Sequence, residues 1–294
     1  MAHERCLGAQ LHFDKRGGNA DVDERHRDAE KVFERIECVE LPLEAKAELA
    51  SAAAVPKLSF DACVSAVSAR KLRNWRSRAA RSIWGRGCPA RCIEILFTLL
   101  CPGHLCDPLQ NRVYRIILEA QRILDMNGEL LPLFIDLLAR RRRVPRRRHT
   151  PQGPARQFLW ACQQLRWQVH LEDGRIVIER PGHDSRMDLL EPDHDLLAHY
   201  IREDLRLALW AQAAQRRPDE FDGLASPAGI DRTATLSLLN SLRGRERRLL
   251  QTILMGGVDT RERRFKRKLA WHSKCFFCCF FQPLPCGNGS TRAP

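Results

Sequence analysis

The side chains best suited to metal chemistry lie close to the end of the sequence. Thiol and imidazole groups are zinc ligands, and Cys275-x-x-Cys278 has the spacing of half a zinc knuckle. The candidate ligands are His272, Cys275, Cys278 and Cys286. Cys279 competes with its neighbour for the metal, and one Cys-x-x-Cys pair is a weak signal on its own. The sequence therefore leaves two alternatives, a zinc site or a disordered apolar tail without any cofactor.

Acidic residues do not show the clustering that polymerase or nuclease chemistry requires. Those enzymes hold two divalent metal ions between carboxylates. Adjacent acidic pairs occur at 172–173 and 203–204, and we interpret them as ordinary solvent-exposed acids in a turn and on a helix. Gly256-Gly257 ends a helix and does not open one as a phosphate-binding loop would, and the sequence has no recognisable nucleophile signature. We therefore predict no catalytic residues and no polymerase or nuclease activity for this chain.

Arginine is the residue type with the strongest potential for binding. The net charge is +13, and 41 of the 49 basic residues are arginine. The excess lies in residues 70–169 (+14) and 243–294 (+9), separated by acidic stretches at 1–69 (−4) and 170–242 (−6). Guanidinium groups form bidentate hydrogen bonds to phosphate, so these blocks favour salt-sensitive binding of RNA or DNA. A GC-rich gene would enrich arginine as well, and a solvated helix face remains the alternative for each block.

The predicted phosphate contacts lie on three basic stretches. A helix over 70–81 presents arginines around an apolar stripe that includes Trp75, which we assign to the core. The stretch 140–148 reads as a linker that contacts phosphate, acts as a nuclear import signal or is simply solvated. A third stretch, 243–268, is a pair of basic helices. The candidate residues are Arg70, Arg73, Arg76, Arg78, Arg140, Arg141, Arg142, Arg143, Arg146, Arg147, Arg148, Arg245, Arg247 and Arg248.

Apolar residues recur at helical spacing along most of the chain, which predicts a mainly α fold. Helices are expected over 23–39, 42–54, 60–84, 89–101, 107–124, 128–139, 154–165, 193–214, 231–242, 244–255 and 260–270. Residues 167–179 alternate around Asp173-Gly174, which is a strong hairpin signal. Asp107 and Asp231 are expected to cap helices, and Ser59 and Asp61 can cap the helix over 60–84. We expect an irregular multi-helix assembly with one short β-hairpin and a disordered C-terminal tail.

Composition and charge suggest how the chain is organised. The expected segments are 1–58, a helical module at 59–139, an arginine-rich linker at 140–153, a second helical module at 154–270 and a Cys-rich tail at 271–294. No apolar run approaches the ~20 residues that a membrane span needs, and no secretory signal is present. We therefore expect a nuclear or cytoplasmic protein with no membrane partner, in which the twelve cysteines are reduced.

Seven short strings follow one another along the chain in an order that suggests a family. They are Cys6-Leu-Gly-Ala9, Ala53-Ala-Val-Pro-Lys57, Ile83-Trp-Gly85, Glu94-Ile-Leu-Phe-Thr-Leu-Leu100, Pro102-Gly-His-Leu-Cys-Asp-Pro108, Leu242-Arg-Gly-Arg-Glu-Arg-Arg-Leu249 and Ile253-Leu-Met-Gly-Gly-Val258. Together they resemble the C-terminal part of non-LTR retrotransposon reverse transcriptases, which are RNA-directed DNA polymerases. The resemblance covers the end of the palm and the thumb (1–58), the helical region after it and the start of a Cys-x-x-Cys knuckle.

The resemblance implies contact with RNA or DNA but not catalysis. The family's metal-binding aspartates belong to a palm for which this chain has no counterpart, and the later knuckle ligands and the RNase H domain are also missing. We therefore expect a non-catalytic remnant that binds nucleic acid through basic helices, largely without sequence preference. The alternatives are a helical adaptor that binds protein partners through faces such as 193–214, and an inert translated pseudogene product.

Overall fold

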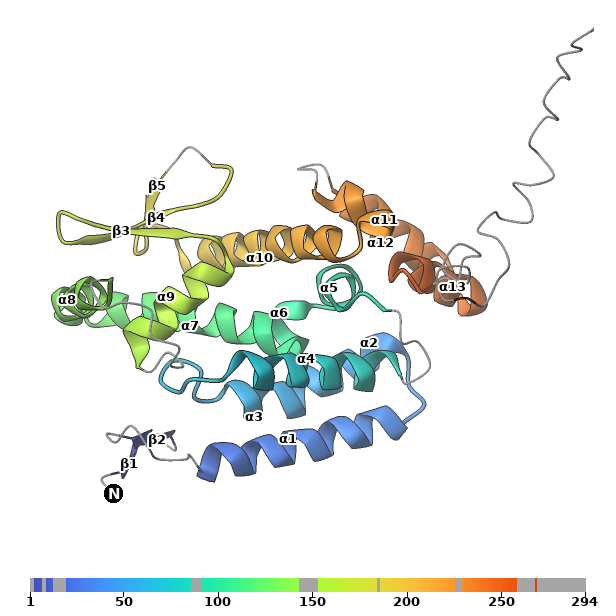
Figure 1. Ribbon diagram of the computed structural model, residues 1–294, viewed down its shortest axis with the longest axis horizontal. Coiled ribbons are helices and arrows are strands. Elements are labelled where there is room, and N and C mark those ends of the chain that lie inside the picture. Colours follow the sequence, from blue (N-terminus) through green and yellow to red (C-terminus); the bar gives the residue numbers. More distant parts are fainter. Residues whose placement is uncertain are drawn as a thin grey trace, which may run out of the picture.

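The computed structural model shows a mainly helical molecule (Figure 1). It describes residues 3–6, 9–12, 20–85, 91–142, 153–183, 186–225, 229–257 and 268. The helices are α1 (Ala20–Cys38), α2 (Leu43–Leu49), α3 (Val55–Ser59), α4 (Ala69–Trp84), α5 (Ile93–Ile95), α6 (Gly103–Cys106), α7 (Pro108–Met126), α8 (Leu130–Arg142), α9 (Pro154–Gln164), α10 (His194–Arg216), α11 (Pro218–Phe221), α12 (Arg232–Ser241) and α13 (Gly244–Leu254). Two π-helical turns, η1 (Ala50–Ala54) and η2 (Leu96–Leu100), and one 3-10 turn, η3 (Asp222–Ala225), join them. The prediction of a mainly α fold is confirmed, while the tail at 271–294 and the helix expected over 260–270 lie outside the described residues, except for Lys268.

The helix expected over 42–54 runs further than the sequence suggests. α2 continues through η1 into α3 and ends at Ser59, beyond Pro56. The prediction that this helix stops before Pro56 is therefore wrong. Pro56 lies in the first turn of α3, and the π-helical turn before it changes the hydrogen-bond register, so its missing N–H and its ring are tolerated.

The helix expected over 60–84 is shorter than predicted. It begins at Ala69, where the Ser68 side chain accepts a hydrogen bond from the Lys71 backbone N–H at 3.2 Å. Residues 60–68 form a turn and an extended stretch before it, so Asp61 does not cap this helix. The apolar pattern continues through 60–68 because Ala62 is buried and Val67 packs against the core, although Phe60 is exposed.

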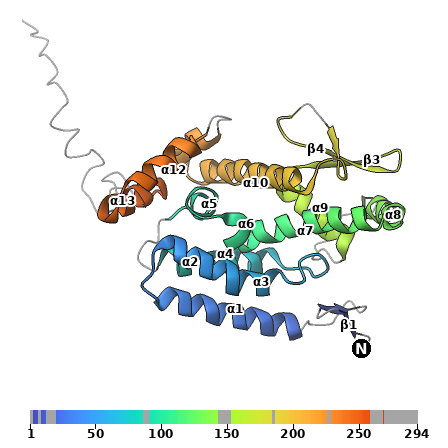
Figure 2. The same cartoon turned by 180° about the vertical axis from the view of Figure 1, so that it is seen from behind.

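The helices stack in layers (Figures 1 and 2). α1 is the outermost and packs on α3 and α4, which in turn pack on α7. α10 lies across the opposite side of α7 and also contacts α5. α12 and α13 pair at one end of the molecule, beyond the C-terminal end of α10 (Figure 2). α10 therefore lies on the side of the stack opposite α1 and packs on the layer that contains α5 and α7.

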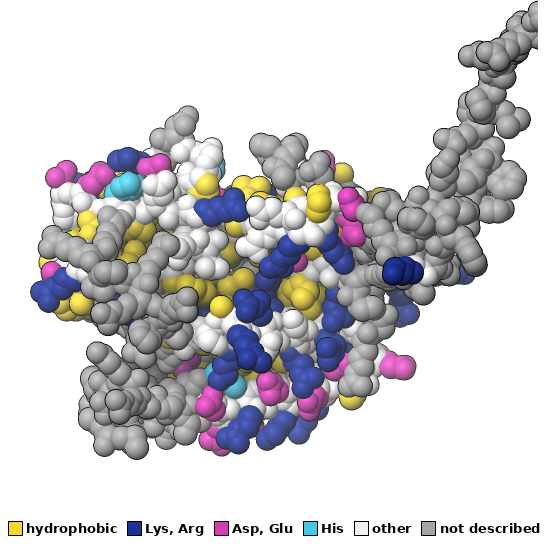
Figure 3. Space-filling model, viewed as in Figure 1, with side chains coloured by type: hydrophobic (Ala, Val, Ile, Leu, Met, Phe, Trp, Pro, Cys, Tyr) yellow, Lys and Arg dark blue, Asp and Glu magenta, His cyan; other side chains and the backbone are white. Residues whose placement is uncertain are grey.

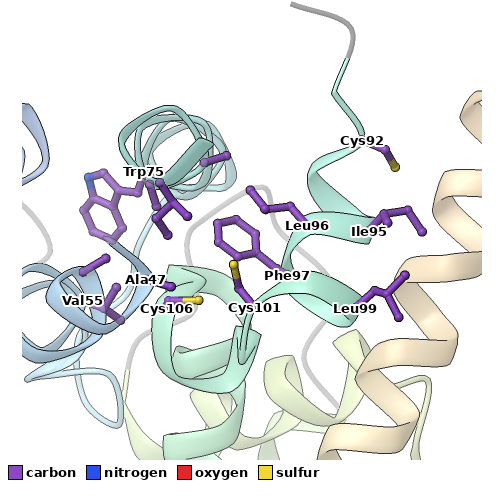
Figure 4. Packing of buried hydrophobic residues seen from close by; sticks show 14 of the residues in the cluster. Ala47, Val55, Trp75, Cys92, Ile95, Leu96, Phe97, Leu99, Cys101 and Cys106 are labelled. Carbon is purple, nitrogen blue, oxygen red and sulfur yellow. The ribbon is translucent and has the colours of Figure 1, made fainter. Parts of the chain in front are cut away.

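Two apolar clusters hold the layers together. The first joins α1–α6 with the end of α10, and Figure 4 shows Phe97 of η2 at its centre, facing Trp75 of α4. The second joins α7, α8, α9 and the hairpin with the first half of α10, including Ile201. Each cluster therefore draws on both sides of the predicted linker at 140–153.

A small antiparallel sheet covers one end of α10. β3 (Gln168–Glu172) and β4 (Arg175–Glu179) pair as predicted, with Asp173 and Gly174 at φ of 47° and 75° in the turn. These positive φ values are those of the tight hairpin turn that Asp-Gly favours. β4 also pairs with β5 (Arg186–Asp188), a third strand that was not predicted because three residues carry too little alternation. β1 (His3–Cys6) and β2 (Ala9–His12) form a separate hairpin, in addition to the one hairpin that was expected.

A buried ion pair fastens this sheet to α10. Asp204 is 2% exposed and accepts hydrogen bonds from the Trp167 indole at 2.6 Å and from Arg180 Nε and Nη2 at 2.8 and 2.9 Å. The Arg180 guanidinium also lies 3.9 Å from the ring centroid of Tyr200. The interpretation of Glu203-Asp204 as solvent-exposed acids is therefore wrong for Asp204, because α10 turns that carboxylate toward the hairpin.

His26 of α1 makes the stability of this layered fold sensitive to acid. Its ring is 5% exposed and lies 4.2 Å from the Trp75 ring, edge to face. Burial, with a smaller contribution from the charge of Lys71, lowers the pKa of His26 from 6.5 to about 4. The unfolded chain then binds a proton at a higher pH than the folded chain does. The free energy of unfolding should therefore fall as the pH drops from 6.5 to 4.

We expect this loss to be about 1–2 kcal/mol after solvent screening. Urea unfolding at pH 7 and pH 4.5 measures it, with His26→Gln as the comparison. The variant should lose less stability than the wild type over this interval, because its side chain does not titrate. Equal losses in the two proteins would contradict the assignment to His26.

Candidate nucleic-acid interface

The four arginines of α4 that the sequence predicts as phosphate contacts differ in their surroundings. Arg70 and Arg73 are exposed and make no hydrogen bond or ion pair within the part of the chain that the structure describes. Arg78 is partly exposed and pairs with Glu34 of α1 at 2.8 Å. Arg70 and Arg73 are therefore the two whose guanidinium groups are open to a ligand.

Arg76 points the other way, into the protein. Its Nε lies 3.0 Å from both carboxylate oxygens of Asp107, and its Nη2 lies 2.9 Å from one of them. Asp107 is fully buried, and it also caps α7 by accepting from the Leu109 N–H at 3.0 Å. Arg76 therefore holds α4 against α7, and its charge is compensated before any phosphate approaches.

A basic cavity opens between α4, the start of α5 and the end of α10. We call it the α4–α10 pocket, and its volume is about 240 Å³. It is lined by Arg73, Arg76, Ser77, Arg91, Cys92, Ile93, Glu94, Ala213, Arg216 and Arg217. Five arginines from three separate stretches thus line one space, with Arg76 turned toward Asp107, and Glu94 is the single acidic residue among the described residues of the lining.

That carboxylate orients the pocket wall. Glu94 is 5% exposed; its Oε1 accepts from Arg216 Nη1 at 2.5 Å and its Oε2 accepts from the Cys92 thiol at 3.5 Å. Arg216 remains 61% exposed, so one face of its guanidinium group is fixed while the rest meets solvent. Burial raises the pKa of the Cys92 thiol to about 12, which keeps it protonated and a poor nucleophile. The pocket can therefore bind an anion but lacks an activated thiol.

The remaining arginines of the pocket are held at its rim. Arg91 Nη1 donates to the Gly85 carbonyl at 2.7 Å, and Arg217 pairs with Glu220 at 3.2 Å. Figure 3 shows dark-blue side chains gathered over α4 and the adjoining side of α10, whereas magenta side chains are more frequent along α1. Positive potential therefore collects at the pocket and weakens toward the outer layer.

One of the other two predicted basic stretches adjoins this pocket through the end of α13, where the Cys92 backbone N–H donates to the Met255 carbonyl at 3.0 Å. Arg140 is exposed in the last turn of α8 and pairs with Asp136, so the helix extends into the expected linker. Arg141 and Arg142 end α8, whereas Arg143, Arg146, Arg147 and Arg148 lie outside the described residues. On α13, Arg245 and Arg248 are exposed without a partner in the described ranges, and Arg247 pairs with Glu44 at 2.5 Å. Among the described arginines of these two stretches, none lines the α4–α10 pocket together with Arg73.

The predicted zinc ligands His272, Cys275, Cys278 and Cys286 also lie outside the described residues. Within the described ranges, no group of three or more His, Cys, Asp or Glu side chains could hold a metal ion. The described part of the chain likewise has no helix that combines the length and the apolar character of a bilayer span.

Three arginines of the pocket were missed at the level of sequence. Arg216 and Arg217 follow the helix expected over 193–214. They belong to a stretch with a net charge of −6, so the charge pattern does not indicate a basic site there. Arg91 stands alone between two apolar segments. The doublet at 216–217, placed at a helix C-terminus, was the signal available, because basic residues there are common and often exposed.

Comparison of the chain with protein-family models, with curated proteins and with solved structures gives no match.

Proposed function

We propose that this chain is a non-catalytic, nucleic-acid-binding helical segment of a retroelement reverse transcriptase of the non-LTR type. The observation that carries the binding function is the convergence of Arg73, Arg91 and Arg216 on the α4–α10 pocket. The family assignment is supported by the colinear sequence strings alone. No polymerase or nuclease activity is assigned to this chain, since neither activity has a carboxylate cluster in the sequence to support it.

The chemistry of the pocket suits the phosphodiester backbone. Arg73 and Arg216 come from different helices, and each can offer a planar pair of N–H donors to phosphate oxygens. No base-specific contact is required, so binding should be largely independent of sequence. RNA and DNA share this backbone, and the pocket as described gives no preference between them.

Salt dependence of binding tests this proposal. Removing two phosphate contacts with Arg73→Gln/Arg216→Gln should make the slope of log K against log salt shallower by about 1.8 on duplex DNA, or about 1.4 on a single strand. Fluorescence anisotropy with a labelled oligonucleotide, at several salt concentrations, measures this slope for full-length protein. Affinity at low salt should fall as well.

A matched variant controls for lost charge. Arg122→Gln/Arg175→Gln removes the same charge from exposed arginines that pair with Glu119 and lie near Asp188, outside the pocket. Its slope should stay close to that of the wild type. Equal slopes in all three proteins would refute the assignment of nucleic-acid binding to the pocket.

An adaptor that binds protein partners is the second candidate function. The apolar stripe of α10 that was expected to serve it, including Leu197, Ile201 and Leu205, is buried inside the molecule. An apolar groove between α7 and α8 favours it instead, lined by exposed Ile123, Leu130, Leu133 and Leu137 among others. A partner that stays bound after nuclease treatment, together with salt slopes unaffected by the pocket variant, would favour this function over nucleic-acid binding.

A further inference from the structure

A second basic cavity, separate from the α4–α10 pocket, lies between α6, α10 and the start of α12. We call it the α10–α12 pocket, and its volume is about 320 Å³. The histidines and arginines that line it are His104, His199, Arg202, Arg206 and Arg232. None of these five residues was predicted as a contact, because they are scattered over 129 positions and four of them lie in the acidic stretch 170–242.

Carboxylates do not balance these charges. Among the described residues that line the pocket, Glu203 is the only acidic one, and it is already paired with Arg206. Arg202 and Arg232 are exposed and have no hydrogen bond or ion pair to any residue that the structure describes. The buried Nε of Arg206 also lacks an acceptor among those residues.

The basic groups are close enough to act on one another. His104 is partly buried, and its pKa is lowered by burial first and then by the charges of Arg202 and Arg232. Like charges that approach without a counter-charge cost free energy, and a bound anion would relieve that repulsion. An anion bound there would supply the counter-charge that the lining of the pocket lacks.

The wall around His104 is held in place. Gly103 leaves no room for a side chain, because a Cβ there would lie 2.0 Å from the Phe97 carbonyl oxygen. Asn111 donates to the His104 carbonyl at 2.8 Å, and the His104 ring packs 5.2 Å from the Tyr114 ring. A donor group fixed before the ligand arrives loses little entropy on binding.

The geometry points to the α10–α12 pocket as a second anion-binding site, which takes a phosphate group between Arg202, Arg232 and His104. The ligand class is a phosphate ester or polyphosphate, because two guanidinium groups and an imidazole can together donate to several oxygens of one phosphate. A nucleic-acid backbone and a free polyphosphate share this chemistry. The site stands independently of the nucleic-acid function proposed for the α4–α10 pocket.

Titration of the full-length protein with inorganic tripolyphosphate tests this site. The imidazole signals of His104, assigned with His104→Asn, should shift in NMR spectra as the anion binds. In Arg202→Gln/Arg232→Gln, the dissociation constant for tripolyphosphate, measured from the His104 signals, should rise by about tenfold or more. Arg122→Gln/Arg175→Gln should bind like the wild type, and so should Arg73→Gln/Arg216→Gln, whose changes lie in the other pocket.

Unmoved His104 signals, or equal affinity in the Arg202→Gln/Arg232→Gln and Arg122→Gln/Arg175→Gln proteins, would overturn the second site. A failure of nucleic-acid binding at the α4–α10 pocket would leave this result unchanged, so the two proposals can fail separately. Thermal melts confirm that each variant is folded. Displacement of tripolyphosphate from His104 by an oligonucleotide identifies the nucleic-acid backbone as the phosphate source, and lack of displacement identifies free polyphosphate.

Discussion

Replacing Asp204 with alanine should destabilise the protein by about 3–5 kcal/mol, which is the usual cost of breaking a buried ion pair. The change leaves the Arg180 guanidinium, which is 8% exposed, without its carboxylate, and it leaves the Trp167 indole N–H without its acceptor. Both groups are too buried for water to replace the lost bonds fully. Urea unfolding followed by circular dichroism measures the change in free energy.

Two further variants distinguish the stability lost with the ion pair from the stability lost by any substitution in α10. Asp195→Ala removes an exposed aspartate from the first turn of the same helix, and it should cost about 1 kcal/mol or less. Arg180→Leu/Asp204→Leu should recover much of the stability lost in Asp204→Ala, because no unpaired charge remains buried. An Asp204→Ala protein within 1 kcal/mol of Asp195→Ala would show that the ion pair matters little.

Phe97→Ala should have an effect of similar size, about 3–5 kcal/mol, because it removes an aromatic ring from a packed core. Phe97 is 1% exposed and lies in η2 at the centre of the first apolar cluster (Figure 4). The surrounding side chains come from several helices, so they cannot collapse into the cavity together. The midpoint and slope of urea unfolding report the loss.

A surface phenylalanine provides the comparison for Phe97. Phe60 is 53% exposed, and Phe60→Ala should cost about 1 kcal/mol or less even though Arg25 lies 5.0 Å from its ring. Phe97→Leu should fall between the two alanine variants, since leucine refills part of the space. Similar stability of Phe97→Ala and Phe60→Ala would contradict the central place of η2 in the core.

The Asp204 ion pair and the apolar cluster around Phe97 both matter for anion binding, because they hold in place the helices that line the two basic pockets. α10 carries Arg202 and Arg216, one for each pocket, and the Asp204 ion pair fixes that helix to the hairpin. The Trp210 indole donates to the Thr98 hydroxyl at 2.8 Å and so ties α10 to η2. The spacing between arginines on different elements therefore depends on the core, which is why a loosened core should weaken anion binding as well.

The sequence by itself determined most of the local structure. Helical spacing of apolar residues and the Asp-Gly turn identify most of the helices and the hairpin, because both signals act between near neighbours. Two of the predicted caps form: Asp107 accepts from the Leu109 N–H at 3.0 Å and Asp231 from the Ala234 N–H at 2.9 Å. These two caps need only their own helix, so the sequence pattern identifies them, whereas the cap of α4 is Ser68 and not the predicted Asp61.

Only the tertiary structure decided which charged side chains are open to a ligand and which are held in ion pairs within the protein. Arg73 and Arg76 stand three positions apart on one helix, yet one faces solvent and the other is held by Asp107, which lies 31 positions further along the chain. Arg216 likewise meets Glu94 across a separation of 122 residues. Coulombic attraction and burial act through space, whereas the patterns in a sequence report neighbours along the chain. The basic pockets therefore form only when the helical layers pack together and bring arginines from distant parts of the sequence side by side.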